Sequence, residues 1–152
     1  MSIKLGIIGT SWWADAMYLP ALVNSGAEVV ALCGRNTDRL TEMADQWKIP
    51  GRYTDYTAML DTAKLDAVII SATNDLHHPM TLAALERNLH VLCEKPLALN
   101  YAQAKEMAAV ANAKGVKHLV PFTYRYMPVF HYLKELVDGD YLGTPYHLNL
   151  RY

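Results

Sequence analysis

The sequence has no excess of charge of either sign. Fourteen lysines and arginines stand against fifteen aspartates and glutamates in 152 residues, and the formal net charge is −1. These charges are scattered along the chain and form no basic stripe, which excludes a nucleic-acid-binding arm and a polybasic segment for an anionic membrane. Small molecules are therefore the expected partners.

Long apolar segments are also absent. The longest apolar runs, such as residues 67–72, are far shorter than the roughly 20 residues that a membrane-spanning helix needs. The N-terminus does not show the charged region followed by an apolar core that is typical of a secretory signal. We therefore expect no membrane attachment and a cytoplasmic location.

Cysteine is scarce, with only two residues in the chain. Cys33 and Cys93 each close an apolar run, where a small apolar side chain fits the end of a buried strand. Reduced structural thiols are favoured over a disulfide or a nucleophile. His77 and His78 are adjacent and have no third ligand beside them, so we expect no metal site.

What the sequence does contain is a regular alternation of short apolar runs and helical patterns. Several of the runs are apolar on both faces, as strands of a covered parallel sheet are. The predicted strands are residues 3–8, 29–33, 67–71, 90–93 and 117–123, and the predicted helices are 13–23 (interrupted by Pro20), 38–47, 56–60, 79–87 and 101–114. Asn36 or Thr37 can cap the second helix, and Asn100 and Gly115 can cap the last. The pattern predicts a doubly wound α/β domain.

The pattern changes after Thr123. Residues 128–137 are predicted to be helical, residues 139–145 are rich in turn formers, and residues 146–152 alternate apolar and polar side chains with the period of a strand. The rest of the sequence offers this last strand no antiparallel partner. Its unpaired backbone groups predict a homo-oligomer or strand exchange between chains.

The stretch LGIIGTSWWADAM, residues 5–17, resembles the phosphate-binding turn of a dinucleotide fold. Its spacing is Gly9-x-Ser11-x-x-Ala14, against the fingerprint G-x-G-x-x-G/A. Gly9 permits the tight turn, and Ala14 lets the helix pack closely on the strand. Ser11 replaces the second glycine and adds a hydroxyl that can donate to a phosphate oxygen, beside the free N–H groups of the helix N-terminus.

The end of the second predicted strand indicates the cofactor. About 25 residues after the first glycine, NAD-binding domains usually place a carboxylate on the ribose 2′-hydroxyl. Here Gly34 leaves room for a 2′-phosphate, and the guanidinium of Arg35 can bind it. Arg39, one helical turn along, can assist. The sequence therefore favours NADP, with NAD as the second choice.

Three motifs carry a resemblance to the Gfo/Idh/MocA oxidoreductase family, the relatives of glucose–fructose oxidoreductase and inositol dehydrogenase. They are GIIGTSWWA, SATNDLHHPMTLAALERNLHVLCEKPLALN and TYRYMPVFHYLKELVDGDYLG. The resemblance covers essentially the whole chain, and Glu94-Lys95-Pro96 is its most specific part. It implies a Rossmann NAD(P)-binding fold in residues 1–123. Residues 124–152 would then be the crossover helix and first strand of a second α/β domain, before which the chain is cut short.

The resemblance also implies roles for individual residues. Lys95 would be catalytic, positioning the substrate hydroxyl and easing its proton loss, and Glu94 would lie with it beside the nicotinamide ribose. Pro96 would follow a cis bond. The residues expected around the cofactor are Gly9, Thr10, Ser11, Trp12, Trp13, Arg35, Asn36, Arg39, Ser71, Thr73, Asn74, His77, Glu94, Lys95 and Arg125.

Two hypotheses follow for the function. The first is the NADP(H)-binding portion of an oxidoreductase that transfers hydride between a nicotinamide cofactor and a sugar, polyol or related carbonyl compound. This portion is expected to be inactive alone, because family members place further substrate contacts in the second domain. The second is a non-catalytic nucleotide-binding sensor or interaction module. Lys95 favours the first, since a sensor does not need that lysine.

Overall fold

The computed structural model describes residues 2–151. The chain divides into two compact units, of which the first ends at Pro121 and the second begins at Phe122. No helix in the described part of the chain is long and apolar enough to cross a membrane.

The first unit is built on a six-stranded parallel sheet with the strand order β3-β2-β1-β4-β5-β6. The strands are β1 (Lys4–Ile8), β2 (Glu28–Cys33), β3 (Gly51–Tyr53), β4 (Ala67–Ile70), β5 (His90–Cys93) and β6 (His118–Leu119). The order reverses direction between β1 and β4, which is the topological switch point of such sheets. The predicted doubly wound parallel sheet is confirmed.

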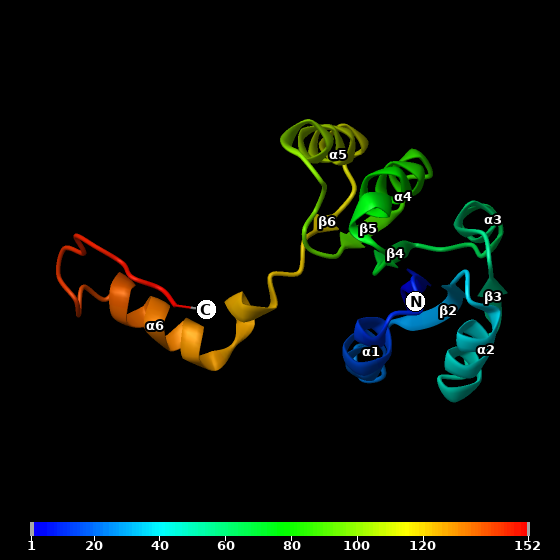
Figure 1. Cartoon of the computed structure of the whole chain (residues 1–152), viewed down its shortest axis with the longest axis horizontal. Helices are drawn as coiled ribbons and strands as arrows, with labels where there is room; N and C mark the ends of the chain where they lie inside the picture. The colour runs from blue at the N-terminus through cyan, green and yellow to red at the C-terminus, as the bar shows by residue number, and fades with distance from the viewer. Residues whose placement is uncertain (1, 152) are drawn as a thin grey trace. The chain divides into compact units, whose positions relative to one another are not determined.

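Helices cover both faces of the sheet (Figure 1). One face carries α1 (Leu19–Leu22) and α2 (Thr37–Gln46), and the other carries α3 (Tyr56–Thr62), α4 (Asn74–Glu86) and α5 (Tyr101–Lys114). Neighbouring strand residues enter opposite cores: Ile7 packs with Leu19 and Leu40, whereas Ile8 packs in the core that contains Met80. This alternation explains why consecutive residues of the central strands, such as Ile7 and Ile8, are apolar.

The helix after β1 is wider than an α-helix in its first part. A π-helical segment, η1 (Ala14–Tyr18), leads directly into α1. The Leu19 N–H donates to the Ala14 carbonyl, five residues back. Pro20 has no N–H to donate and its ring crowds the preceding turn, and a wider turn accommodates both effects. Pro20 therefore lies within a continuous helix whose preceding turn is π-helical, and it does not end the helix.

Three elements differ from the sequence prediction. The structure adds β3, whose three residues are too few to show a period. It starts α4 at Asn74 instead of residue 79, so Pro79 lies inside the helix, and it reduces the predicted strand 117–123 to β6. Both helix caps expected at Asn36 and Asn100 are present, with their side chains accepting N–H bonds from Arg39 and Gln103 at 3.0 Å.

The second unit contains a 3-10 turn, η2 (Thr123–Tyr126), and one helix, α6 (Pro128–Asp138). The predicted strand 146–152 does not form within the described residues: residues 145–151 have no regular secondary structure, and Tyr152 lies outside them. A strand needs a neighbour to bond its N–H and C=O groups, and within the described chain nothing pairs with the segment. An alternating pattern of apolar and polar residues is therefore not sufficient to form a strand here.

Candidate cofactor site

A cavity of about 640 Å³ lies at the carboxyl edge of the sheet, around the switch point. It is lined from the ends of four neighbouring strands and from the first turns of α4. Its lining residues are Ile8, Gly9, Thr10, Ser11, Cys33, Gly34, Arg35, Asn36, Thr54, Asp55, Tyr56, Ser71, Ala72, Thr73, Leu76 and Met80. Seven of the residues expected around the cofactor are brought together here: Gly9, Thr10, Ser11, Arg35, Asn36, Ser71 and Thr73.

Gly9 forms the turn between β1 and the cavity. Its φ is +116°, and an added Cβ would lie 2.2 Å from the carbonyl oxygen of Ser71. Its N–H donates to the Cys33 carbonyl at 2.8 Å. The turn is therefore held between the ends of β2 and β4, and only glycine fits it.

Ser11 caps the helix that follows this turn. Its Oγ accepts the N–H of Ala14 at 3.1 Å and lies 2.8 Å from the Oγ of Ser71. A serine hydroxyl has two acceptor lone pairs and one proton. If Ser71 donates, the two lone pairs of Ser11 are used inside the protein and its proton remains for a ligand. The replacement of the second glycine is thus compatible with an anion in the cavity.

Gly34 lines the cavity at the end of β2. It is buried, and an added Cβ would lie 2.4 Å from Cγ2 and 2.8 Å from Oγ1 of Thr10. Thr10 therefore fills the space that a side chain at position 34 would enter, and the room that the sequence suggested beside this glycine is not open at its Cβ position. Arg35 follows with an exposed side chain, and Asn36 uses its amide oxygen to cap α2.

Arg39 is engaged outside the cavity. Its guanidinium donates to Asp15 on the helix after β1, and to Glu42 at 2.7 Å. Trp47 also donates to Asp15, at 2.7 Å. These two carboxylates raise the pKa of Arg39, Glu42 more than Asp15. Arg39 thus joins two helices in this structure and is not among the cavity residues.

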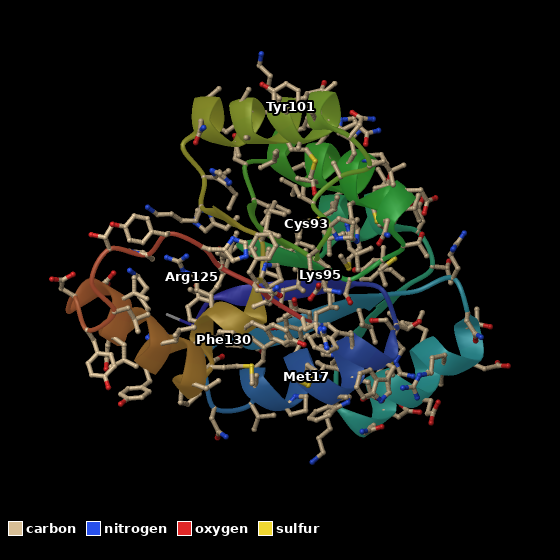
Figure 2. All side chains as sticks on the ribbon, turned by 60° about the vertical axis from the view of Figure 1, so that its left-hand side comes forward. Met17, Cys93, Lys95, Tyr101, Arg125 and Phe130 are labelled. Carbon is tan, nitrogen blue, oxygen red and sulfur yellow. The ribbon has the colours of Figure 1, made fainter. Side chains whose placement is uncertain are left out.

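Glu94 and Lys95 follow β5 on the same edge of the sheet, and Figure 2 shows Lys95 just beyond Cys93. The Lys95–Pro96 bond is cis, as the resemblance implies. The Glu94 side chain is 7% exposed and its carboxylate is used inside the protein: one oxygen accepts the Tyr18 hydroxyl and the other accepts the Lys95 N–H at 3.0 Å. The Lys95 side chain is exposed.

His77 holds the segment after Lys95 in place. Its ring is 1% exposed, with Nδ1 2.7 Å from the Pro96 carbonyl oxygen and Nε2 3.1 Å from that of Ala72. Asn74 and His77 lie in the first turns of α4, whereas the helix predicted from residue 79 would have left them outside it. The buried His77 side chain therefore connects α4 to the Glu94-Lys95-Pro96 turn. Asn74 and His77 are not among the residues that line the cavity.

The remaining expected residues are placed as follows. Trp12 and Trp13 lie at the start of the helix after Ser11, with ring centroids 6.0 Å apart, and Trp12 is 70% exposed. Arg125 lies in η2, in the second unit, whereas every cavity residue belongs to the first. Within residues 2–151, no group of three or more His, Cys, Asp or Glu side chains is arranged to hold a metal ion.

Sequence reasoning missed two contributions to this edge. The loop after β3 adds Thr54 and Asp55 to the cavity, and the first residue of α3 adds Tyr56. Tyr18 reaches Glu94 from a helix that is 76 residues away along the chain. No local signal marks such a contact, because a half-buried tyrosine in an apolar helical pattern is read as part of the core.

The parallel sheet, the glycine turn at its switch point and the cavity beside it define a dinucleotide-binding domain of the Rossmann class. The chain belongs to the Gfo/Idh/MocA family: residues 3–122 match the family model described as an oxidoreductase family with an NAD-binding Rossmann fold. The recognition from the sequence motifs is thus confirmed.

Individual relatives agree with this assignment. The chain is 40% identical over 141 residues to a D-xylose 1-dehydrogenase (NADP(+)) of Haloferax volcanii, covering 91% of this chain and 42% of the relative. It is 32% identical to an inositol 2-dehydrogenase of Salmonella typhimurium, covering 95% of this chain and 44% of the relative. The chain therefore spans less than half the length of these relatives.

Solved structures show the same fold. The myo-inositol 2-dehydrogenase of Lactobacillus plantarum superposes with a TM-score of 0.89 at 31% identity, over 95% of this chain and 43% of that one. A scyllo-inositol dehydrogenase of Lactobacillus casei, solved with NAD(H) and scyllo-inositol, also has a TM-score of 0.89, at 23% identity, over 94% of this chain and 43% of that one. Relatives that use NADP and relatives that bind NAD thus share this architecture.

Proposed function

We propose that this chain is the NADP(H)-binding portion of an oxidoreductase that transfers hydride between the nicotinamide and a sugar, a polyol or a related small carbonyl compound. The observation that carries the proposal is the cavity at the switch point, with Gly34 packed on Thr10 and Arg35 at its adenosine side. No carboxylate stands at position 34, where it would repel a 2′-phosphate, and a guanidinium is at hand to bind it. The name of the Haloferax volcanii relative, which specifies NADP(+), is consistent with this choice.

The two ends of the dinucleotide are assigned by the order of the strands. The adenosine end, with its 2′-phosphate, would lie at β2 beside Arg35, and the pyrophosphate would lie over the Gly9 turn near Ser11. The nicotinamide would then reach the ends of β4 and β5, where Ser71, Thr73 and Lys95 stand. Bound there, the cofactor would accept the hydride from the carbon that bears the substrate hydroxyl, or return it to a carbonyl carbon in the reverse reaction.

Lys95 is proposed as the catalytic residue on the protein side. Its side chain is exposed at the edge where the nicotinamide would end, and its ammonium can hold a substrate hydroxyl and favour loss of its proton through electrostatic attraction. Arg125 is proposed, from the family resemblance alone, to approach the nicotinamide or the substrate.

We further propose that residues 1–123 form the cofactor domain and that residues 124–152 lead into a substrate domain. Because the chain spans less than half of its relatives' length, turnover by the chain alone is not expected. Orientation of the substrate by a second domain supplies much of the rate in such reactions. Self-association through the C-terminal segment is proposed as its state in isolation.

Thermal unfolding with NADPH and with NADH at equal concentrations tests the cofactor proposal. A ligand at 100 times its dissociation constant stabilises the folded state by roughly 2.7 kcal/mol, which is a readable change in melting temperature for a domain of this size. We expect the larger shift with NADPH. A larger shift with NADH would overturn the NADP preference, and no shift with either would overturn cofactor binding by this chain.

A further inference from the structure

Tyr18 connects the helix of the phosphate turn to the turn that carries Lys95. Its hydroxyl donates to Glu94, and its ring lies beside the core formed with Ala14 and Leu19. Figure 2 labels Met17, the residue before Tyr18, on the helix after β1, and Lys95 beyond the end of β5. Two elements that face different parts of the dinucleotide are thus tied by one side chain.

The buried carboxylate of Glu94 receives one of its hydrogen bonds from the Tyr18 hydroxyl. A buried carboxylate is costly unless donors satisfy its oxygens. The structure supplies one donor to each oxygen, the Tyr18 hydroxyl and the Lys95 N–H. Burial of the hydroxyl, together with the hydrogen bond to Glu94 and the charge of this carboxylate, raises the pKa of Tyr18, so Tyr18 stays protonated and remains a donor.

The second side of the same turn is fixed independently. His77 contacts the Pro96 carbonyl from α4, and the Glu94 N–H donates to the Ile70 carbonyl of β4 at 3.0 Å. From the helix after β1, Tyr18 is the residue that bonds the Glu94 carboxylate. The backbone N–H of Lys95 is therefore aimed at a carboxylate whose position Tyr18 sets.

We propose that Tyr18 is a positioning residue for the nicotinamide half of the cofactor, acting through Glu94 on the Lys95 turn. This inference rests on the proposed function, because it requires the dinucleotide to extend from β2 to β5. Tyr18 is on the sheet face opposite α4 and does not line the cavity, so the adenosine half does not depend on it. Loss of its hydroxyl should therefore weaken one half of the ligand selectively.

The test compares two ligands on the full chain. NADPH carries the nicotinamide, whereas 2′-phospho-ADP ends at the pyrophosphate; if the chain prefers NADH, the pair becomes NADH and ADP. Calorimetry gives the dissociation constant of each for the wild type, for Tyr18→Phe and for Tyr53→Phe. Tyr53 is the matched control, since its hydroxyl accepts from Thr62 at 3.1 Å and the residue is not part of the cavity lining.

We expect Tyr18→Phe to bind NADPH about tenfold more weakly and 2′-phospho-ADP unchanged, because hydrogen bonds to charged groups are among the stronger ones. Deuterium exchange at the Lys95 amide should accelerate in the same variant. Tyr53→Phe should change neither dissociation constant. A general loss of stability would weaken both ligands together and could not produce this split.

The double variant Tyr18→Phe with Glu94→Gln removes the buried charge and serves if the single variant does not fold. It is expected to show the same selective loss, since no tyrosine hydroxyl holds the side chain at position 94. Equal loss for both ligands, or no loss for either, would overturn the role of Tyr18 while the cofactor assignment stands. A wild type that binds neither ligand would overturn the proposed function itself.

Discussion

At the scale of single residues, the proposed preference for NADP is tested most directly at Gly34. Replacing it by aspartate would place a carboxylate where we propose the ribose 2′ position, and would also push against Thr10, whose Cγ2 would lie 2.4 Å from the new Cβ. We expect Gly34→Asp to lower NADPH affinity at least tenfold, about 1.4 kcal/mol, through repulsion of the 2′-phosphate. Fluorescence titration with NADPH and with NADH measures the change.

The steric part of that effect can be separated from the charge. Gly34→Ala keeps the collision with Thr10 and adds no charge, so it should weaken both dinucleotides alike. Adding Thr10→Ala to Gly34→Asp removes both atoms that would lie within 3 Å of the new Cβ, the methyl group at 2.4 Å and the hydroxyl at 2.8 Å, and should restore NADH binding while NADPH stays weak. If Gly34→Asp with Thr10→Ala still prefers NADPH, the selectivity does not reside at this position.

Arg35 and Arg39 provide a second, independent comparison. Arg35 lines the cavity, whereas Arg39 bonds Asp15 and Glu42. We expect Arg35→Ala to weaken NADPH about tenfold and to leave NADH unchanged, because only NADPH carries the 2′-phosphate that we propose the guanidinium binds. Arg39→Ala should alter neither affinity. An equal loss of NADPH binding in Arg39→Ala would return that residue to the phosphate site.

These residues also show how far the sequence could go. Gly34 and Arg35 line the cavity as expected, because their position after a strand places them at that edge of the sheet; the roles that we propose for them are inferred from the same position. The buried bonds of Glu94 and His77 are not, because each joins segments that only the folded chain brings together. Sequence spacing predicts which residues reach the edge of the sheet. It does not show which of their side chains already form hydrogen bonds to other parts of the protein.

At the scale of elements, α5 is the helix whose two ends the sequence predicts, with Asn100 at its N-cap and Gly115 at its C-terminal end. Asn100 accepts the Gln103 N–H at 3.0 Å, and the Gln103 side chain accepts the Leu99 N–H at 3.1 Å. We expect Asn100→Ala to lower the free energy of unfolding by about 1 kcal/mol, because the first turn loses its acceptor. Urea denaturation gives the value from the shift of the midpoint.

The control for this cap lies in the same helix. Asn112→Ala loses only a 3.3 Å contact with His118 and gains helix propensity, so it should leave stability nearly unchanged. A similar loss in both variants would show that the effect of Asn100→Ala is not specific to the cap.

Element boundaries can be predicted from the sequence only where local side chains determine them. Asn100 and Gly115 mark the two ends of α5 in this way, and Gly115 has the expected positive φ of 66°. The boundaries of α4 and β3 are different. At α4 the strongest local signal, Pro79, pointed to the wrong residue, since tertiary packing extends the helix through it. The three residues of β3 are held by pairing with β2, a long-range contact that no window of sequence contains.

At the scale of the whole molecule, apolar side chains are exposed throughout the second unit. They include Phe130 on α6, and Tyr146, Leu148 and Leu150 in the segment that was predicted to be a strand, which are 93%, 81% and 74% exposed. Exposed apolar surface and unpaired backbone groups both favour association between chains.

We expect the isolated chain to form oligomers whose population rises with concentration in sedimentation velocity experiments. Leu148→Lys with Leu150→Lys should shift it toward monomer, because each lysine removes apolar area and adds repulsion along the segment. Ile3→Lys with Val23→Lys makes the same charge change on exposed residues of the first unit and should leave association intact. NADPH-dependent stabilisation should persist in both variants, since the cavity is built entirely from the first unit. A wild-type chain that stays monomeric at every concentration would contradict this prediction, and the exposed segment would then need no partner copy.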